Sequence, residues 1–97
     1  MEMDERAKAL MEKCKVVADD PSVVSTCKIM LETLEEKKVK ITEAPPEQTY
    51  LEMAETLSPE DVPRVLEMAL VVTKSKEIKD PDIIVAADRL IRAIEMC

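Results

Sequence analysis

The stretch that decides the fold is DPDIIVAADRLIRAIEM, residues 80–96, and it has a counterpart in DPSVVSTCKIMLETLEE, residues 20–36. Each stretch begins with Asp-Pro. The aspartate is a good helix N-cap, and the proline takes the first helical position, where its missing N–H costs nothing. Apolar residues then recur three and four positions apart, as on the buried face of an amphipathic helix. We therefore predict one helix from Pro21 to about Lys38 and another from Pro81 to about Met96.

The predicted buried faces of these two helices match position by position. They are Val23, Val24, Cys27, Met30, Leu31 and Leu34 in the first, and Ile83, Ile84, Ala87, Leu90, Ile91 and Ile94 in the second. Two explanations remain open. Either the chain contains a true structural repeat, or any two amphipathic helices that start with Asp-Pro would align in this way.

Three further helices are expected, from about Asp4 to Ala18, from about Pro46 to Leu57, and from about Val62 to Ile78. Ser58 to Glu60 should form a turn, with Asp61 as the cap of the helix that follows. Val39 to Ala44 has no partner strand and is expected to be an extended linker. The positions expected to face inward are Ala7, Leu10, Met11, Cys14, Val17 and Ala18; Tyr50, Leu51, Ala54 and Leu57; and Val62, Val65, Leu66, Ala69, Leu70 and Thr73.

These elements predict an all-α fold in a single domain of residues 1–97. We expect five helices, arranged as two helical hairpins plus a shorter middle helix in a closed orthogonal or superhelical bundle. A chain of 97 residues buries roughly 60–65% of its extended surface, which is enough for a modest core.

The chain contains no Gly and no Asn. Those are the residues that enter left-handed backbone conformations most readily. Without them the chain lacks the commonest helix C-cap and the tightest hairpin turns. Any helix end in the left-handed region must therefore use an ordinary residue, and Lys38, Val39 and Leu57 are the expected places.

Composition excludes several functional classes. The formal net charge of −7 repels nucleic acid and anionic membranes. The single aromatic residue, Tyr50, offers no platform for stacking bases. The N-terminus MEMDERAKAL lacks the apolar core of a signal peptide, and no apolar run is long enough to span a membrane. We expect a soluble, acidic, cytoplasmic protein, of the kind obtained by recombinant expression, with no nucleic-acid or membrane partner.

No catalytic, cofactor-binding or metal-binding residues are expected. The chain has no His, so a Cys–His or Ser–His pair cannot form. The paired carboxylates, such as Asp80 and Asp82, are interpreted as helix caps and solvated faces, and the methionines as core filling. Cys14 and Cys27 should lie level if the first two helices are antiparallel. A disulfide or redox switch is one interpretation of that pair, and two small buried hydrophobes are the favoured one.

The helix, Asp-Pro turn, β-branched pair and spaced aliphatics of residues 20–36 and 80–96 resemble the second helix of HEAT and armadillo repeats. Such repeats bind protein partners along helix faces. Val24 and Ile84 lie near the place where HEAT repeats often carry a basic residue. Two hairpins are also fewer than the three or more repeats of a usual solenoid, so a closed domain fits better.

The agreement of caps, short Pro-bearing joints and charged outer faces also resembles a computationally designed helical protein. The first interpretation of function is therefore a designed, de novo scaffold, monomeric, whose purpose is its fold. The alternative is a natural interaction module similar to a HEAT or armadillo fragment. An enzyme is not expected. No cofactor or partner is expected either, apart from weak self-association or a dimer through Cys97.

Overall fold

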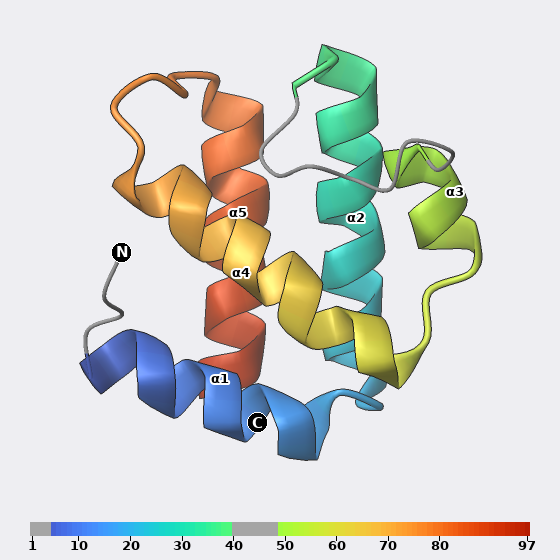
Figure 1. Cartoon of the computed structure of the whole chain (residues 1–97), viewed down its shortest axis with the longest axis vertical. Coiled ribbons are helices and arrows are strands. Elements are labelled where there is room, and N and C mark those ends of the chain that lie inside the picture. Colours follow the sequence, from blue (N-terminus) through green and yellow to red (C-terminus); the bar gives the residue numbers. More distant parts are fainter. Residues whose placement is uncertain (1–4, 40–48) are drawn as a thin grey trace.

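The computed structural model describes residues 5–39 and 49–97 and confirms the predicted all-α fold (Figure 1). The described ranges contain helices and no strands. The elements are α1 (Glu5–Val17), α2 (Pro21–Lys37), α3 (Tyr50–Glu55), a short 3-10 turn η1 (Pro59–Asp61), α4 (Val62–Lys74) and α5 (Pro81–Glu95).

Both Asp-Pro starts form the caps that the sequence predicts. The Asp20 carboxylate accepts a hydrogen bond from the backbone N–H of Ser22, and the Asp80 carboxylate accepts one from Asp82, each at 2.9 Å. Each cap satisfies one of the backbone donors that the first turn of a helix leaves without an intrahelical partner. Consequently α2 and α5 begin where they were predicted to begin.

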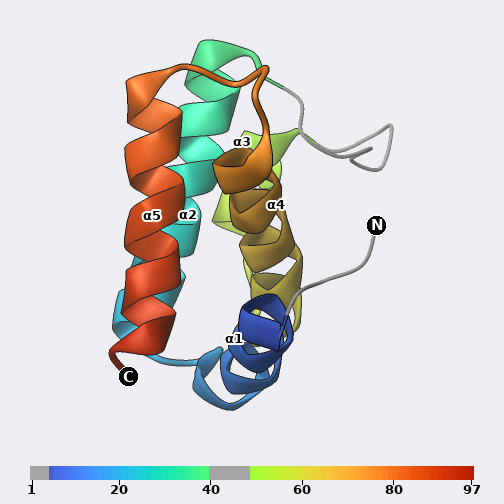
Figure 2. The ribbon, with the colours of Figure 1, turned by 90° about the vertical axis from the view of Figure 1, so that its left-hand side faces the viewer.

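The helices form two layers. α2 and α5 lie side by side in one layer, and α4 packs across both of them from the other layer, with α1 below and α3 beside α2 (Figures 1 and 2). The Lys37 ammonium at the end of α2 lies 3.6 Å from the Asp80 carboxylate and 3.1 Å from that of Asp82, at the start of α5. The end of one helix therefore meets the start of the other, and the pair is antiparallel.

The first helix does not form the packed hairpin with α2 that we predicted. α4 and α5 make a well-packed pair, but α1 packs mainly against α4 and α5 (Figure 1). The Lys13 ammonium donates to the backbone carbonyl of Glu95 at 2.7 Å, and Arg6 pairs with the Glu95 carboxylate at 3.1 Å. Because a cation near the carbonyl end of a helix is favourable, these contacts hold α1 across the end of α5. At the Asp19-Asp20 turn the chain therefore changes direction without placing α1 alongside α2, and we call this turn a corner.

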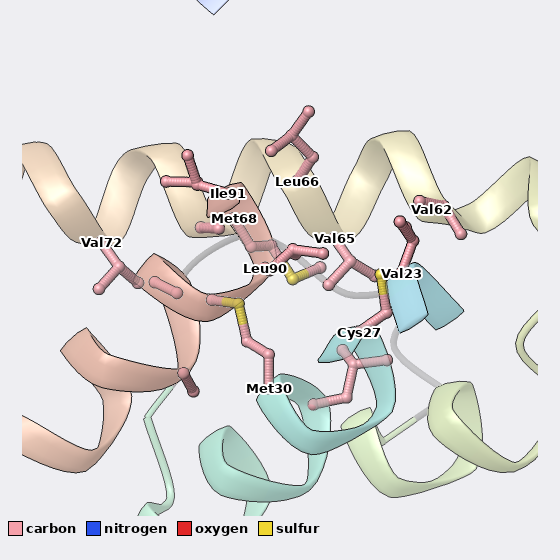
Figure 3. Close-up of a cluster of buried hydrophobic side chains, with 14 of the residues drawn as sticks. Val23, Cys27, Met30, Val62, Val65, Leu66, Met68, Val72, Leu90 and Ile91 are labelled. Carbon is pink, nitrogen blue, oxygen red and sulfur yellow. The ribbon is translucent and has the colours of Figure 1, made fainter. Parts of the chain in front are cut away.

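One core joins both layers. Met30 of α2, Val65 of α4 and Leu90 of α5 lie together in it, each essentially without exposed surface (Figure 3). Every buried side chain in the described residues is apolar, apart from the hydroxyl of Tyr50, and no buried side-chain polar atom there lacks a partner. The driving force for folding is therefore apolar burial, at about 25 cal/mol per Å² removed from water.

Three predicted inward positions are wrong: Leu51, Thr73 and Ile84 are exposed. Thr73 shows one reason, because its hydroxyl donates to the Leu70 carbonyl at 2.9 Å and needs no core partner. Positions that are only half-buried are Met11, Val17, Val24, Leu57 and Leu70. Positions that are buried although the predicted faces omitted them are Met53, Met68, Val72 and Ala86. α4 carries two of these because α1, α2 and α5 all contact it, which widens its buried face.

The third helix is shorter than predicted. Thr49 is extended (φ −85°, ψ 165°), and its hydroxyl accepts a hydrogen bond from the Glu52 N–H at 3.1 Å, so α3 begins at Tyr50. Residues 46–48, which were expected to belong to it, lie outside the described residues, as do residues 40–44 of the expected linker. Within that linker Val39 is half-buried and packs against the core.

The fourth helix begins at Val62, as predicted, but its cap and its end differ from the prediction. Asp61 is not its side-chain cap: the Asp61 carboxylate instead accepts from the N–H and hydroxyl of Ser58, each at 3.1 Å, and closes the turn η1. Pro63 lies in the first turn of α4, as expected. The helix ends at Lys74, short of Ile78. Ser75 is extended and its hydroxyl accepts from the Glu77 N–H at 3.2 Å, which stabilises a turn there.

One of the three expected left-handed positions is left-handed. Lys38 has φ 56° and ψ 38°, and it is the one residue with positive φ in the described part of the chain. The N–H of Lys38 bonds to the Glu35 carbonyl, and the N–H of Val39 bonds to the Leu34 carbonyl. These bonds close the C-terminus of α2 in the way that Gly usually does.

Candidate interaction surface

The two helical cysteines are core residues. Cys14 and Cys27 have no exposed surface, and both are free thiols. Burial raises the pKa of Cys14 to about 11. Burial, with a smaller contribution from Cys14, raises the pKa of Cys27 to about 12. A neutral, inaccessible thiol is a poor nucleophile, so the favoured interpretation of two small buried hydrophobes is confirmed.

The carboxylates form ion pairs and hydrogen bonds that join helices. Asp80 and Asp82 hold Lys37, whose pKa is raised first by its hydrogen bond to Asp82 and then by the charges of both aspartates. Glu35 accepts a hydrogen bond from the Tyr50 N–H at 3.1 Å and so joins the start of α3 to α2. The sequence analysis did not anticipate this bond, because its two residues belong to different helices. No group of three or more potential metal ligands lies among residues 5–39 and 49–97.

The methionines were interpreted as core filling, and those within the described helices agree with that interpretation. Met30 and Met68 are buried, and Met11 packs partly against the core. Met1 and Met3 lie outside the described residues. Among the described helices, none combines the length and the apolar character that a membrane span requires.

The candidate interaction surface is the outer side of the layer formed by α2 and α5. α1, α3 and α4 do not cover this side (Figure 2). The contacts of Lys37 fix the register of the pair: residues of α2 and α5 whose numbers add to about 118 lie level, at 1.5 Å of rise per residue. Ile29 is therefore level with Arg89, and Val85 with Thr33.

Two large apolar side chains are exposed on this side. Ile29 is 44% exposed and Val85 is 48% exposed. The register places them about one turn apart along the helices, roughly 6 Å, on axes about 8–10 Å apart. Both residues lie outside the buried faces predicted from the sequence. The sequence nevertheless marks both, because each is an apolar residue on the charged side of an amphipathic helix.

The threonines beside Ile29 extend the apolar surface. The Thr26 hydroxyl donates to the Val23 carbonyl at 2.9 Å, and the Thr33 hydroxyl donates to the Ile29 carbonyl at 2.7 Å. With its hydroxyl bonded to the helix backbone, each threonine leaves its methyl group for other contacts. We call the strip formed by Thr26, Ile29, Thr33 and Val85 the α2–α5 seam.

Charged residues flank the seam. The exposed charged side chains of the two helices are Lys28, Glu32, Glu36 and Lys37 on α2 and Asp82, Asp88, Arg89, Arg92 and Glu95 on α5. Four of them are basic and five are acidic. Arg92 pairs with Asp88 at 3.1 Å, whereas Glu32 and Arg89 form no ion pair with any described residue.

Other exposed apolar side chains are scattered over different elements. Val16 is on α1, Leu51 on α3, Ile84 on the side of α5 away from α2, and Met96 at the end of α5. Single exposed apolar residues are normal on protein surfaces. Comparison with protein-family models, curated proteins and solved structures finds no match for this chain.

Proposed function

We propose that this chain is a protein-interaction module that binds an amphipathic helix of a protein partner on the α2–α5 seam. The observation that carries the proposal is the exposed Ile29 and Val85, about one turn apart on the side of the helix layer that α1, α3 and α4 leave open. An amphipathic helix binds by placing its apolar face against exposed apolar side chains of its partner. Two helices that lie side by side, with such side chains between charged residues, offer that kind of surface. The resemblance of residues 20–36 and 80–96 to HEAT and armadillo helices supports the same class of function.

The test is a selection from a displayed library of amphipathic helical peptides against the whole chain. We expect enriched peptides to lose binding at least tenfold when Ile29→Glu and Val85→Glu are combined, because a carboxylate would then be buried without a partner. The matched control combines Val16→Glu and Leu51→Glu, which replaces two apolar residues of similar or greater exposure elsewhere. Peptides that bind both variants equally, or no enrichment at all, would contradict the proposal.

A designed scaffold without a biochemical function is the second candidate. Its support is local consistency: Asp20, Thr49 and Asp80 each cap a helix with a side-chain hydrogen bond. Idealised scaffolds are typically hyperstable, so a thermal circular-dichroism melt distinguishes the candidates. A midpoint above about 90 °C would favour the scaffold, whereas a midpoint of about 45–65 °C would favour the interaction module.

A further inference from the structure

We infer that α3 is a lid, which detaches from α2 as a unit while the other helices stay folded and so uncovers a second binding site for a short helix of a protein partner. This site is on the side of α2 that faces α3, away from α5 (Figure 1). It does not include the residues of the α2–α5 seam. The inference therefore goes beyond the proposed function and is tested separately from it.

α3 is the least anchored of the described helices. It has 6 residues, and isolated helices shorter than about 12 residues are marginal in water. Among the described helices, α2 is the one against which α3 packs extensively, whereas α1, α2, α4 and α5 each pack in this way against at least two others. Because elements with few tertiary contacts open at a lower free energy than the core of a domain, α3 opens before the rest of the chain unfolds.

The contact between α3 and α2 has an apolar part and a polar part. Tyr50, Met53 and Ala54 lie on one side of α3 and are buried. The Tyr50 N–H, one of the donors that the first turn of a helix leaves without an intrahelical partner, bonds to the Glu35 carboxylate of α2 at 3.1 Å. Leu31 lies one turn before Glu35 on the same side of α2 and has no exposed surface. When α3 detaches, an apolar side chain and a hydrogen-bond acceptor therefore become accessible together.

The sequence of α3 defines the chemistry of the partner that fits this site. It is a short helical segment with an aromatic residue at its first helical position and Met and Ala one turn later, as Tyr50, Met53 and Ala54 are in α3. Its first backbone N–H replaces that of Tyr50 at the Glu35 carboxylate. Such a segment binds the open state alone, so its apparent affinity is reduced by the fraction of chains in which α3 is detached.

Native-state amide hydrogen exchange of the whole chain tests whether α3 opens as a unit. The reporters are the amides of Tyr50, Met53 and Thr56, whose hydrogen bonds extend from the start of α3 to its end. We expect one common protection factor for the three, about a hundredfold or more below that of the α5 amides. Glu35→Ala should lower all three by the same factor, whereas Glu36→Ala, at an exposed glutamate of the same helix, should lower none. Protection equal to that of α5, or a change at Tyr50 alone, would overturn the lid.

Binding of a fluorescent, N-acetylated peptide of residues 49–57 to the whole chain tests the site beneath the lid. Met53→Ala in the chain removes a buried side chain of α3 and leaves the site on α2 unchanged, so the open fraction rises. We expect this variant to bind the peptide about tenfold or more tightly than the parent chain does, while circular dichroism shows that it stays helical. The matched control, Leu51→Ala, replaces an exposed residue of the same helix and should bind as the parent does.

The peptide itself provides the second control. A peptide that carries Tyr50→Ala and Met53→Ala lacks the apolar side that α3 buries and should bind neither chain. A peptide of the natural sequence that binds the parent and the Met53→Ala chain equally, or binds neither, would overturn the site. Ile29→Glu combined with Val85→Glu should leave this binding unchanged, so failure of the lid site and failure of the α2–α5 seam are distinguishable.

Discussion

The left-handed residue at the end of α2 makes a quantitative prediction for Lys38→Gly. In the left-handed region the Cβ of an L-residue approaches the following carbonyl oxygen, at a cost of roughly 1–2 kcal/mol. Lys38 has φ 56° and ψ 38° and is fully part of that region. Glycine removes the clash but gives the unfolded chain more freedom, which offsets about 0.4–1 kcal/mol of the gain. The expected net stabilisation is about 0.5–1 kcal/mol.

Urea unfolding followed by circular dichroism measures the change, with Lys38→Ala as the matched control. Alanine removes the exposed lysine side chain and keeps the Cβ, so its free energy of unfolding should stay within about 0.5 kcal/mol of the parent. The glycine variant should also melt about 3–6 °C higher. The reasoning is refuted if Lys38→Gly is no more stable than Lys38→Ala, because the Cβ clash would then contribute nothing.

Three further outcomes are expected. Ile94→Ala, at a position with no exposed surface, should cost about 2–5 kcal/mol in urea unfolding, whereas Ile84→Ala should cost less than about 1 kcal/mol; equal costs would contradict the assigned core. Asp20→Ala should cost about 1 kcal/mol through loss of the N-cap, and Asp20→Asn, which can still accept the bond, should recover most of it. In a thiol-labelling assay at pH 8, only Cys97 should react in the native chain. Burial raises the pKa of the Cys14 thiol from 9.0 to about 11 and that of the Cys27 thiol to about 12. Their contribution to the free energy of unfolding is therefore present below pH 9 and lost as the pH rises through these pKa values. Replacing both cysteines by Ala should reduce this loss of stability at alkaline pH.

Local features could be predicted from the sequence and long-range ones could not. The Asp-Pro starts of α2 and α5 were predicted because an N-cap and a proline act within one turn. The corner between α1 and α2 was missed because the apolar stripe of α1 reports burial but not which helix covers it. The end of α4 at Lys74 was missed although the turn at Ser75 is local, because residues 75–79 contain no Pro and the chain has no Gly to mark the end of a helix. The position of the exposed Ile29 relative to α5 could be assigned only after the contacts of Lys37 gave the register of α2 and α5.

The position of α1 explains why the α2–α5 seam exists. A packed α1–α2 hairpin could have covered the outer side of α2. Instead Lys13 and Arg6 hold α1 on the end of α5, and its buried face contributes to the layer that contains α4. α3 is joined to α2 by the Glu35 bond, on the side of α2 away from α5 (Figure 1). All three helices outside the pair thus contact it from the inner side or the edge. Ile29 and Val85 are left exposed because α1, α3 and α4 all lie on other sides of the pair.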